Sequence, residues 1–126
     1  MKLNFKKNDG LVPVLVQDHI PNEVLMLAFM NEEAWEKTLS SGYAHYYSRG
    51  RRNLWKKSED SESTQIVKKF FIDCGEDIVL LSVKQNGGAA CHKGYRSCFF
   101  REIDSEEVKI IRTKVFDPED VYKKDK

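Results

Sequence analysis

The chain has 126 residues, of which 40% are hydrophobic and 33% are charged, as is typical of a globular protein with one core. Its 21 basic and 20 acidic side chains nearly cancel, so the composition gives no support for binding to nucleic acid or to a membrane surface. The sequence shows no basic start followed by an apolar run and no apolar stretch long enough to span a bilayer, so we expect a cytoplasmic protein.

The first part of the chain predicts two strands. Branched apolar residues in the segment 10–18 favour a strand, and Pro13 suits either an edge strand or the start of a strand. The apolar run 24–30 is ambiguous between helix and strand. Its short length favours a buried strand.

A helix is predicted after the second strand. Asn31 is a natural N-cap, and the two glutamates that follow it suit the positive end of a helix. Trp35 and Leu39 are four residues apart, which predicts that both lie on the buried face. Gly42 marks the expected end.

The remainder of the chain favours strands and turns. Strands are expected at 44–48, 54–57, 65–73, 77–85, 98–103 and 106–116, with a basic turn after the first of them and a frayed tail over about 115–126. The sum is an α+β fold: a strand-dominated single domain over residues 1–126 with one clear helix.

Three cysteines are an odd number, and in a reducing compartment they are not expected to form disulfides. Cys74 lies in the turn between two predicted strands, and Cys91 and Cys98 bracket a glycine-rich loop. A hairpin could bring Cys74 near that loop, and three thiolates would leave a fourth zinc position for water, as in catalytic sites. Lys93 and Arg96 would offset the negative charge. Three inert core thiols remain the alternative.

Two charged clusters are each compatible with a binding role or with simple exposure. Asp73, Glu76 and Asp77 offer oxygen ligands for magnesium, or form a solvated acidic turn. A basic cluster near residues 49–57 offers a phosphate-binding surface, or forms an exposed hairpin. His19, in a turn, is left unassigned.

Four segments in order resemble the phosphoribosyl-AMP cyclohydrolase family, over nearly the whole chain. They are "GLVPVLVQD", "EVLMLAFMNEEAWEKT", "HYYSRGRRNLWKKSE" and "ACHKGYRSCFFR". The last is close to the family motif ACHTGxxSCF, which is highly specific. The resemblance therefore implies an enzyme that opens an adenine ring in L-histidine biosynthesis.

The resemblance also implies two metal ions. In the family, zinc is bound by cysteines that match Cys74, Cys91 and Cys98, with one Zn²⁺ expected per chain and the sites at the interface of an intertwined homodimer. Magnesium is bound by the three aspartates of a DCDxD motif, of which Asp73 and Asp77 are present here. Gly75 replaces the middle aspartate, so Mg²⁺ binding should be weakened.

The implied substrate is phosphoribosyl-AMP, hydrolysed between nitrogen 1 and carbon 6 of the adenine ring. His92 is our candidate for proton transfer because imidazole titrates in the right range, although a residue beside a ligand can equally support the metal site. We expect Arg49, Arg51 and Lys57 to bind the phosphates. Departures such as Glu62 leave two alternatives: a zinc hydrolase acting on another purine-like ring, or a non-catalytic zinc-stabilised dimer.

Overall fold

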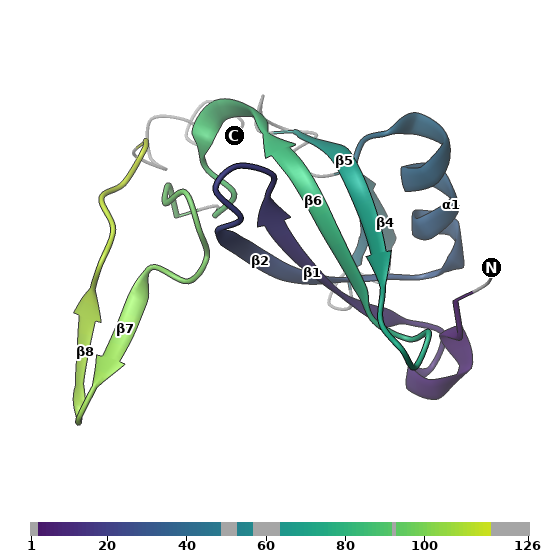
Figure 1. The fold of residues 1–126 in the computed structure, drawn as a ribbon, viewed down its shortest axis with the longest axis horizontal. Helices are drawn as coiled ribbons and strands as arrows, with labels where there is room; N and C mark the ends of the chain where they lie inside the picture. Colours follow the sequence, from purple (N-terminus) through teal and green to yellow (C-terminus); the bar gives the residue numbers. More distant parts are fainter. Residues whose placement is uncertain (1–2, 49–52, 57–63, 92, 117–126) are drawn as a thin grey trace.

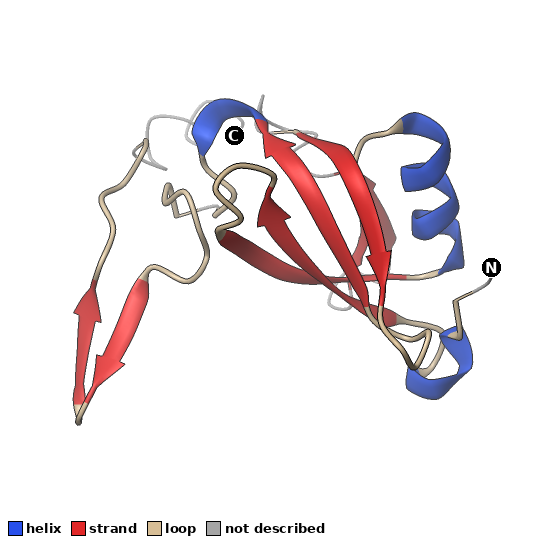
Figure 2. Cartoon of the chain, viewed as in Figure 1, coloured by secondary structure: helices blue, strands red, loops and turns tan. Residues whose placement is uncertain are grey.

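The computed structural model describes residues 3–48, 53–56, 64–91 and 93–116. Strands dominate, with a single α-helix in the described part of the chain, as the predicted α+β class requires (Figures 1 and 2). The elements in chain order are η1 (Phe5–Asn8), β1 (Val12–Asp18), β2 (Val24–Met30), α1 (Glu32–Ser41), β3 (His45–Ser48), β4 (Asn53–Lys56), β5 (Gln65–Ile72), β6 (Val79–Gln85), η2 (Asn86–Gly88), β7 (Arg101–Asp104) and β8 (Glu107–Ile110).

The main sheet has four strands in the order β2-β1-β6-β5. Its outer pairs are antiparallel, whereas the central strands β1 and β6 run parallel, with Val14 opposite Val79 and Asp18 opposite Val83. Pro13 therefore lies near the start of an internal strand. The expectation of a strand start is confirmed, and the edge-strand alternative is wrong because β1 pairs with β2 on one side and with β6 on the other. Proline, which has no N–H to donate, fits here because the pairing with β6 begins only after it.

The core forms where one face of this sheet meets α1. Alternate residues of β1 and β6 are buried, and they pack in one cluster with Ala34 and Trp35 of the helix. Burying each Val or Leu side chain contributes roughly 1.5–3 kcal/mol, so this layer is the main source of stability. A buried hydrogen bond from the Tyr46 hydroxyl to Gln65 Oε1, 2.5 Å long, ties β3 to β5.

The predicted helix is confirmed at both ends, but not in all of its buried face. The Asn31 side chain accepts from the Ala34 N–H, and Gly42 adopts a left-handed conformation as the cap. Leu39, however, is 50% exposed. Thr38 takes its place in the core, because its hydroxyl donates to the Ala34 carbonyl and accepts from the His45 N–H of β3.

The last two strands are shorter than predicted and form a separate hairpin, β7–β8, that extends away from the main sheet (Figure 1). Residues 98–100 are not part of it, because the Cys98 N–H bonds to the Leu25 carbonyl of β2 instead. All residues of both strands are exposed. Most of the tail expected over about 115–126 lies outside the described residues. Among the described helices, none is long and apolar enough to cross a membrane.

Candidate functional site: the cysteine loop and the acidic turn

The loop 86–100 follows β6 and carries two of the cysteines. The Cys91 N–H donates to the Tyr95 carbonyl at 3.1 Å and the Gly94 N–H donates to the Cys91 carbonyl at 3.0 Å, which closes a tight turn. Gly94 has a φ of 95°, a conformation that suits glycine. Cys91 is buried in this turn, and its sulfur accepts the Lys93 N–H at 3.4 Å.

The other cysteine of the loop is anchored on β2. The Cys98 N–H donates to the Leu25 carbonyl at 2.7 Å, and the hydroxyl of the fully buried Ser97 donates to the Val24 carbonyl at 2.7 Å. Cys98 itself is exposed. The backbone N–H of Cys98 and the side chain of the residue before it are therefore held by the first residues of β2, while the Cys98 side chain is exposed.

An ion-pair network fastens the same loop to the end of β1. Arg96 lies between the two cysteines in sequence, and its guanidinium donates to Asp18 and, at 2.5 Å, to Glu23 Oε1. Arg112 donates to Glu23 Oε2 and, at 2.9 Å, to the Phe99 carbonyl. Asp18 is a buried residue, and a buried carboxylate requires such a partner. The expected role of Arg96 as a counter-charge for thiolates is therefore replaced by pairing with carboxylates.

The network also sets the protonation of Glu23. Partial burial raises the pKa of this carboxyl, but the guanidinium groups of Arg112 and Arg96 together outweigh that effect and hold the pKa below its ordinary value. The carboxylate therefore stays ionised to lower pH than a free glutamate does.

The third cysteine lies in the exposed turn between β5 and β6. In this turn the Asp73 carboxylate accepts the N–H groups of Asp77, at 3.2 Å, and Ile78, at 3.1 Å. Slight desolvation raises the pKa of Asp73, but backbone hydrogen bonds from Asp77, Ile78 and Gly75 together outweigh it, so the pKa lies below its ordinary value. Cys74 is exposed beside this ionised carboxylate.

Gly75 lies between the two aspartates in space as well as in sequence. A Cβ atom built on Gly75 would lie 2.8 Å from Asp77 Oδ1 and 3.7 Å from Asp73 Oδ2. A side chain at this position would therefore start between the two carboxylates. Glu76, in contrast, is an exposed turn residue with a φ of 60°.

One chain does not bring the three cysteines together. Cys74 precedes β6 and Cys91 follows it, and a strand of seven residues is about 20 Å long. Among the described residues, no group of three His, Cys, Asp or Glu side chains is placed to hold a metal ion. The expectation that a hairpin brings Cys74 beside the later loop within one chain is wrong, because the turn lies at the opposite end of β6.

Four other candidate residues lie outside the described residues: His92, Arg49, Arg51 and Lys57. Their predicted roles in proton transfer and phosphate binding stay predictions. Sequence reasoning missed the partners of Arg96, namely Asp18 and Glu23. It also left His19 unassigned. In the structure, His19 Nδ1 lies 3.2 Å from Asp18 Oδ1.

Comparisons with a family model and with known proteins all point to the same family. The family model for phosphoribosyl-AMP cyclohydrolase matches residues 26–100. The phosphoribosyl-AMP cyclohydrolase of Desulforapulum autotrophicum is 55% identical over 98% of this chain and 99% of its own length. The proteins of the same name from Oleidesulfovibrio alaskensis and Methanosarcina mazei are 54% and 55% identical, over 95% and 94% of this chain and 92% and 96% of their own lengths.

The Glu23 network predicts a pH-dependent contribution to stability. Because the pKa of Glu23 is lowered on folding, its contribution is complete above the ordinary value of 4.5 and is lost as the pH falls through the folded pKa. We expect Glu23→Gln to lower the free energy of unfolding by about 1–2 kcal/mol at neutral pH, and by progressively less below about pH 4.5. Urea unfolding at several pH values measures this difference.

Glu36→Gln, the same chemical change at an exposed position of α1, serves as the control and should change stability little at any pH. A loss for Glu23→Gln that is equal at neutral and acidic pH would show that the ion pairs with Arg96 and Arg112 do not stabilise the fold.

Proposed function

Because the chain belongs to the phosphoribosyl-AMP cyclohydrolase family, we propose that it hydrolyses the bond between nitrogen 1 and carbon 6 of phosphoribosyl-AMP with the help of zinc. The chain is an enzyme, a hydrolase of the kind that acts on cyclic amidines, and the proposed reaction is a step of L-histidine biosynthesis. The observation that carries the proposal is the cysteine loop 86–100, which is held to β2 by the Cys98 N–H and to β1 by the Arg96 side chain on Asp18.

The three cysteines fit zinc by their chemistry. Thiolates are soft ligands that suit zinc, and three of them leave one tetrahedral position open. Cys91 already accepts the Lys93 N–H, while Cys74 and Cys98 are exposed and accessible to a shared ion. When bound there, zinc would supply a water molecule with a pKa near neutrality as the nucleophile.

The separation of Cys74 from the loop supports a site shared by two chains. Each chain would contribute Cys74 to one zinc and Cys91 with Cys98 to the other, so a homodimer would hold one zinc per chain. The sheet face opposite the core supports such a pairing. Leu27, Leu15 and Leu80 form an apolar row across β2, β1 and β6 on the face opposite the core, and Leu27 is 51% exposed.

The remaining roles follow from the reaction itself. Water adds its oxygen to carbon 6, the bond from carbon 6 to nitrogen 1 breaks, and nitrogen 1 leaves with a proton. His92 would move that proton, since imidazole both accepts and donates near neutral pH. Arg49, Arg51 and Lys57 would bind the substrate phosphates. Asp73 and Asp77 would hold magnesium at the acidic turn, weakly because Gly75 supplies no ligand.

The first test is turnover of phosphoribosyl-AMP by metal-free protein titrated with zinc at fixed magnesium. We expect activity to rise and to saturate near one zinc per chain. Tight zinc binding with no turnover would contradict the proposal. It would favour a zinc-stabilised dimer, or a hydrolase for another purine-like ring if a substrate panel shows turnover of one.

Mixing inactive variants tests whether two chains share each zinc. Cys74→Ser and Cys91→Ser should each be inactive alone, because each removes one zinc ligand. After subunit exchange, mixed dimers would contain one intact site, and an equimolar mixture should regain about one quarter of wild-type activity. The control mixture is Cys91→Ser with Cys98→Ser, which regains nothing because both changes affect the same half of the site. No recovery in the first mixture would rule out sharing in this arrangement.

Restoring the third carboxylate tests the magnesium site. Gly75→Asp would place a carboxylate between Asp73 and Asp77, and the Asp77 side chain must rotate to make room because its Oδ1 lies 2.8 Å from the Cβ position. We expect the magnesium affinity to rise by about tenfold. Isothermal titration with Mg²⁺ measures it. Gly75→Ala, which adds only the Cβ atom, should leave the magnesium affinity unchanged. Equal affinities for the two variants would contradict the proposal that magnesium binds at this turn.

A further inference from the structure

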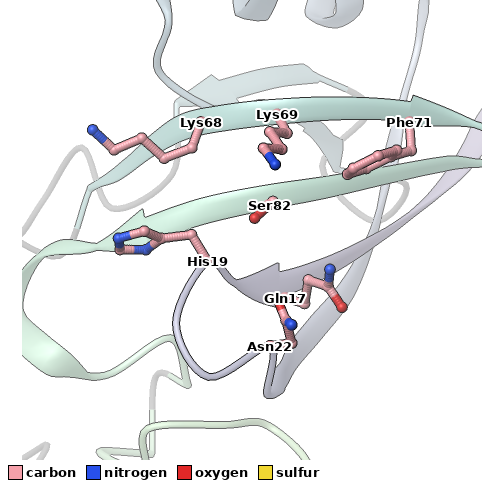
Figure 3. Close-up of a pocket in the computed structure, with 7 residues that line it drawn as sticks. All are labelled: Gln17, His19, Asn22, Lys68, Lys69, Phe71 and Ser82. Carbon is pink, nitrogen blue, oxygen red and sulfur yellow. The ribbon is translucent and has the colours of Figure 1, made fainter.

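A polar pocket lies on the sheet beside the end of β1. Its volume is about 500 Å³. It is lined by residues of β1, β5 and β6 and of the turn after β1: Gln17, His19, Asn22, Lys68, Lys69, Phe71 and Ser82 (Figure 3). None of these residues has a role in the proposed reaction.

The strand register builds the floor of this pocket. Gln17 of β1 lies opposite Ser82 of β6, which lies opposite Lys69 of β5, so these three polar residues form one row across three strands. The next row on the same face is apolar, with Leu15 opposite Leu80. The polar character is therefore confined to the end of the sheet where the pocket lies.

A β-bulge in β5 directs two consecutive lysines to the pocket. The register of β5 on β6 shifts between Val67 and Lys69, so Lys68 is the extra residue. In a regular strand, neighbouring side chains point to opposite faces. Here both lysines line the pocket, and Lys69 points from β5 toward Ser82 of β6 (Figure 3).

The pocket has the charge and the donors that an anion requires. Its described lining residues include two lysines and no carboxylate. The hydroxyl of Ser82 and the amides of Gln17 and Asn22 can also donate hydrogen bonds. The two acidic residues next to lining residues along the chain, Asp18 and Glu23, are both already paired with Arg96. The exposed ring of Phe71 provides an apolar wall beside these donors.

We propose that this pocket binds a phosphate monoester, with Lys69, Ser82 and Gln17 contacting the phosphate group. A phosphate offers several acceptor oxygens, which matches converging ammonium, hydroxyl and amide donors. The phosphate belongs either to the substrate, in which case the inference rests on the proposed function, or to a separate ligand such as free phosphate or a nucleotide monophosphate.

The pocket is connected to the cysteine loop through one carboxylate. His19 lines the pocket, and its Nδ1 lies 3.1 Å from the Val83 carbonyl and 3.2 Å from Asp18 Oδ1. The other oxygen of Asp18 accepts from Arg96 of the cysteine loop. His19 is therefore linked through Asp18 and Arg96 to the segment that holds Cys91 and Cys98.

Binding of inorganic phosphate and of AMP to the intact protein tests the site directly, without any need for turnover. We expect Lys69→Gln to weaken binding of both by about tenfold or more, since it removes a charged donor. Lys69→Arg should retain most of the affinity. Lys37→Gln, the same loss of charge on an exposed position of α1, is the control and should bind as the wild type does. Wild-type affinity in Lys69→Gln would overturn the proposal.

Kinetics with phosphoribosyl-AMP then identify the source of the phosphate. If the pocket takes a substrate phosphate, Lys69→Gln should raise KM with little change in kcat. If it takes a separate phosphate ligand, KM stays at the wild-type value while the binding of inorganic phosphate is lost. Because the binding measurement stands alone, its result is independent of whether the protein turns over phosphoribosyl-AMP.

Discussion

The parallel pairing of β1 with β6 is the constraint on which the rest of the structure depends. Parallel strands need a long connection, and here β2, α1 and β3 to β5 lie between them in sequence. Because β1 and β6 point the same way, the turn after β1 and the loop after β6 leave the sheet at the same end. That neighbourhood lets Arg96 of the cysteine loop reach Asp18, the last residue of β1.

The same pairing divides the three cysteines, the proposed zinc ligands, between the two ends of β6. Cys91 and Cys98 follow the strand and Cys74 precedes it, so one folded chain presents the proposed ligands in two separate parts. A monomer with this topology cannot close the site without unfolding β6, whereas a second chain can complete it at no cost to the sheet. The topology thus makes the proposed activity depend on association, and the apolar face that β1 and β6 leave uncovered gives association a driving force.

The strands and the helix were predictable because their signals are local: alternation, an apolar run, an N-cap and a terminal glycine. The relations between elements were not. The bulge that turns Lys68 toward the pocket cannot be read from spacing, since it depends on which strands pair. The separation of Cys74 from the loop was within reach, because the strand predicted at 77–85 already lies between Cys74 and Cys91. The ion pair of Asp18 was within reach of sequence reasoning. Asp18 continues the alternation of buried residues along β1, and a buried carboxylate requires a cationic partner.

The two metal sites inferred for this chain differ in how much of the fold supports them. Cys91 and Cys98 lie in a loop held by backbone hydrogen bonds to β2 and by the ion pairs of Arg96, so losing that support would disturb the ligands. The acidic turn is held by backbone N–H groups that bond to Asp73, and it needs no side chain at Gly75. Replacing the middle carboxylate by glycine therefore removes a ligand without disturbing the turn. Hence a sequence can lose that aspartate while it keeps the fold and the cysteine loop.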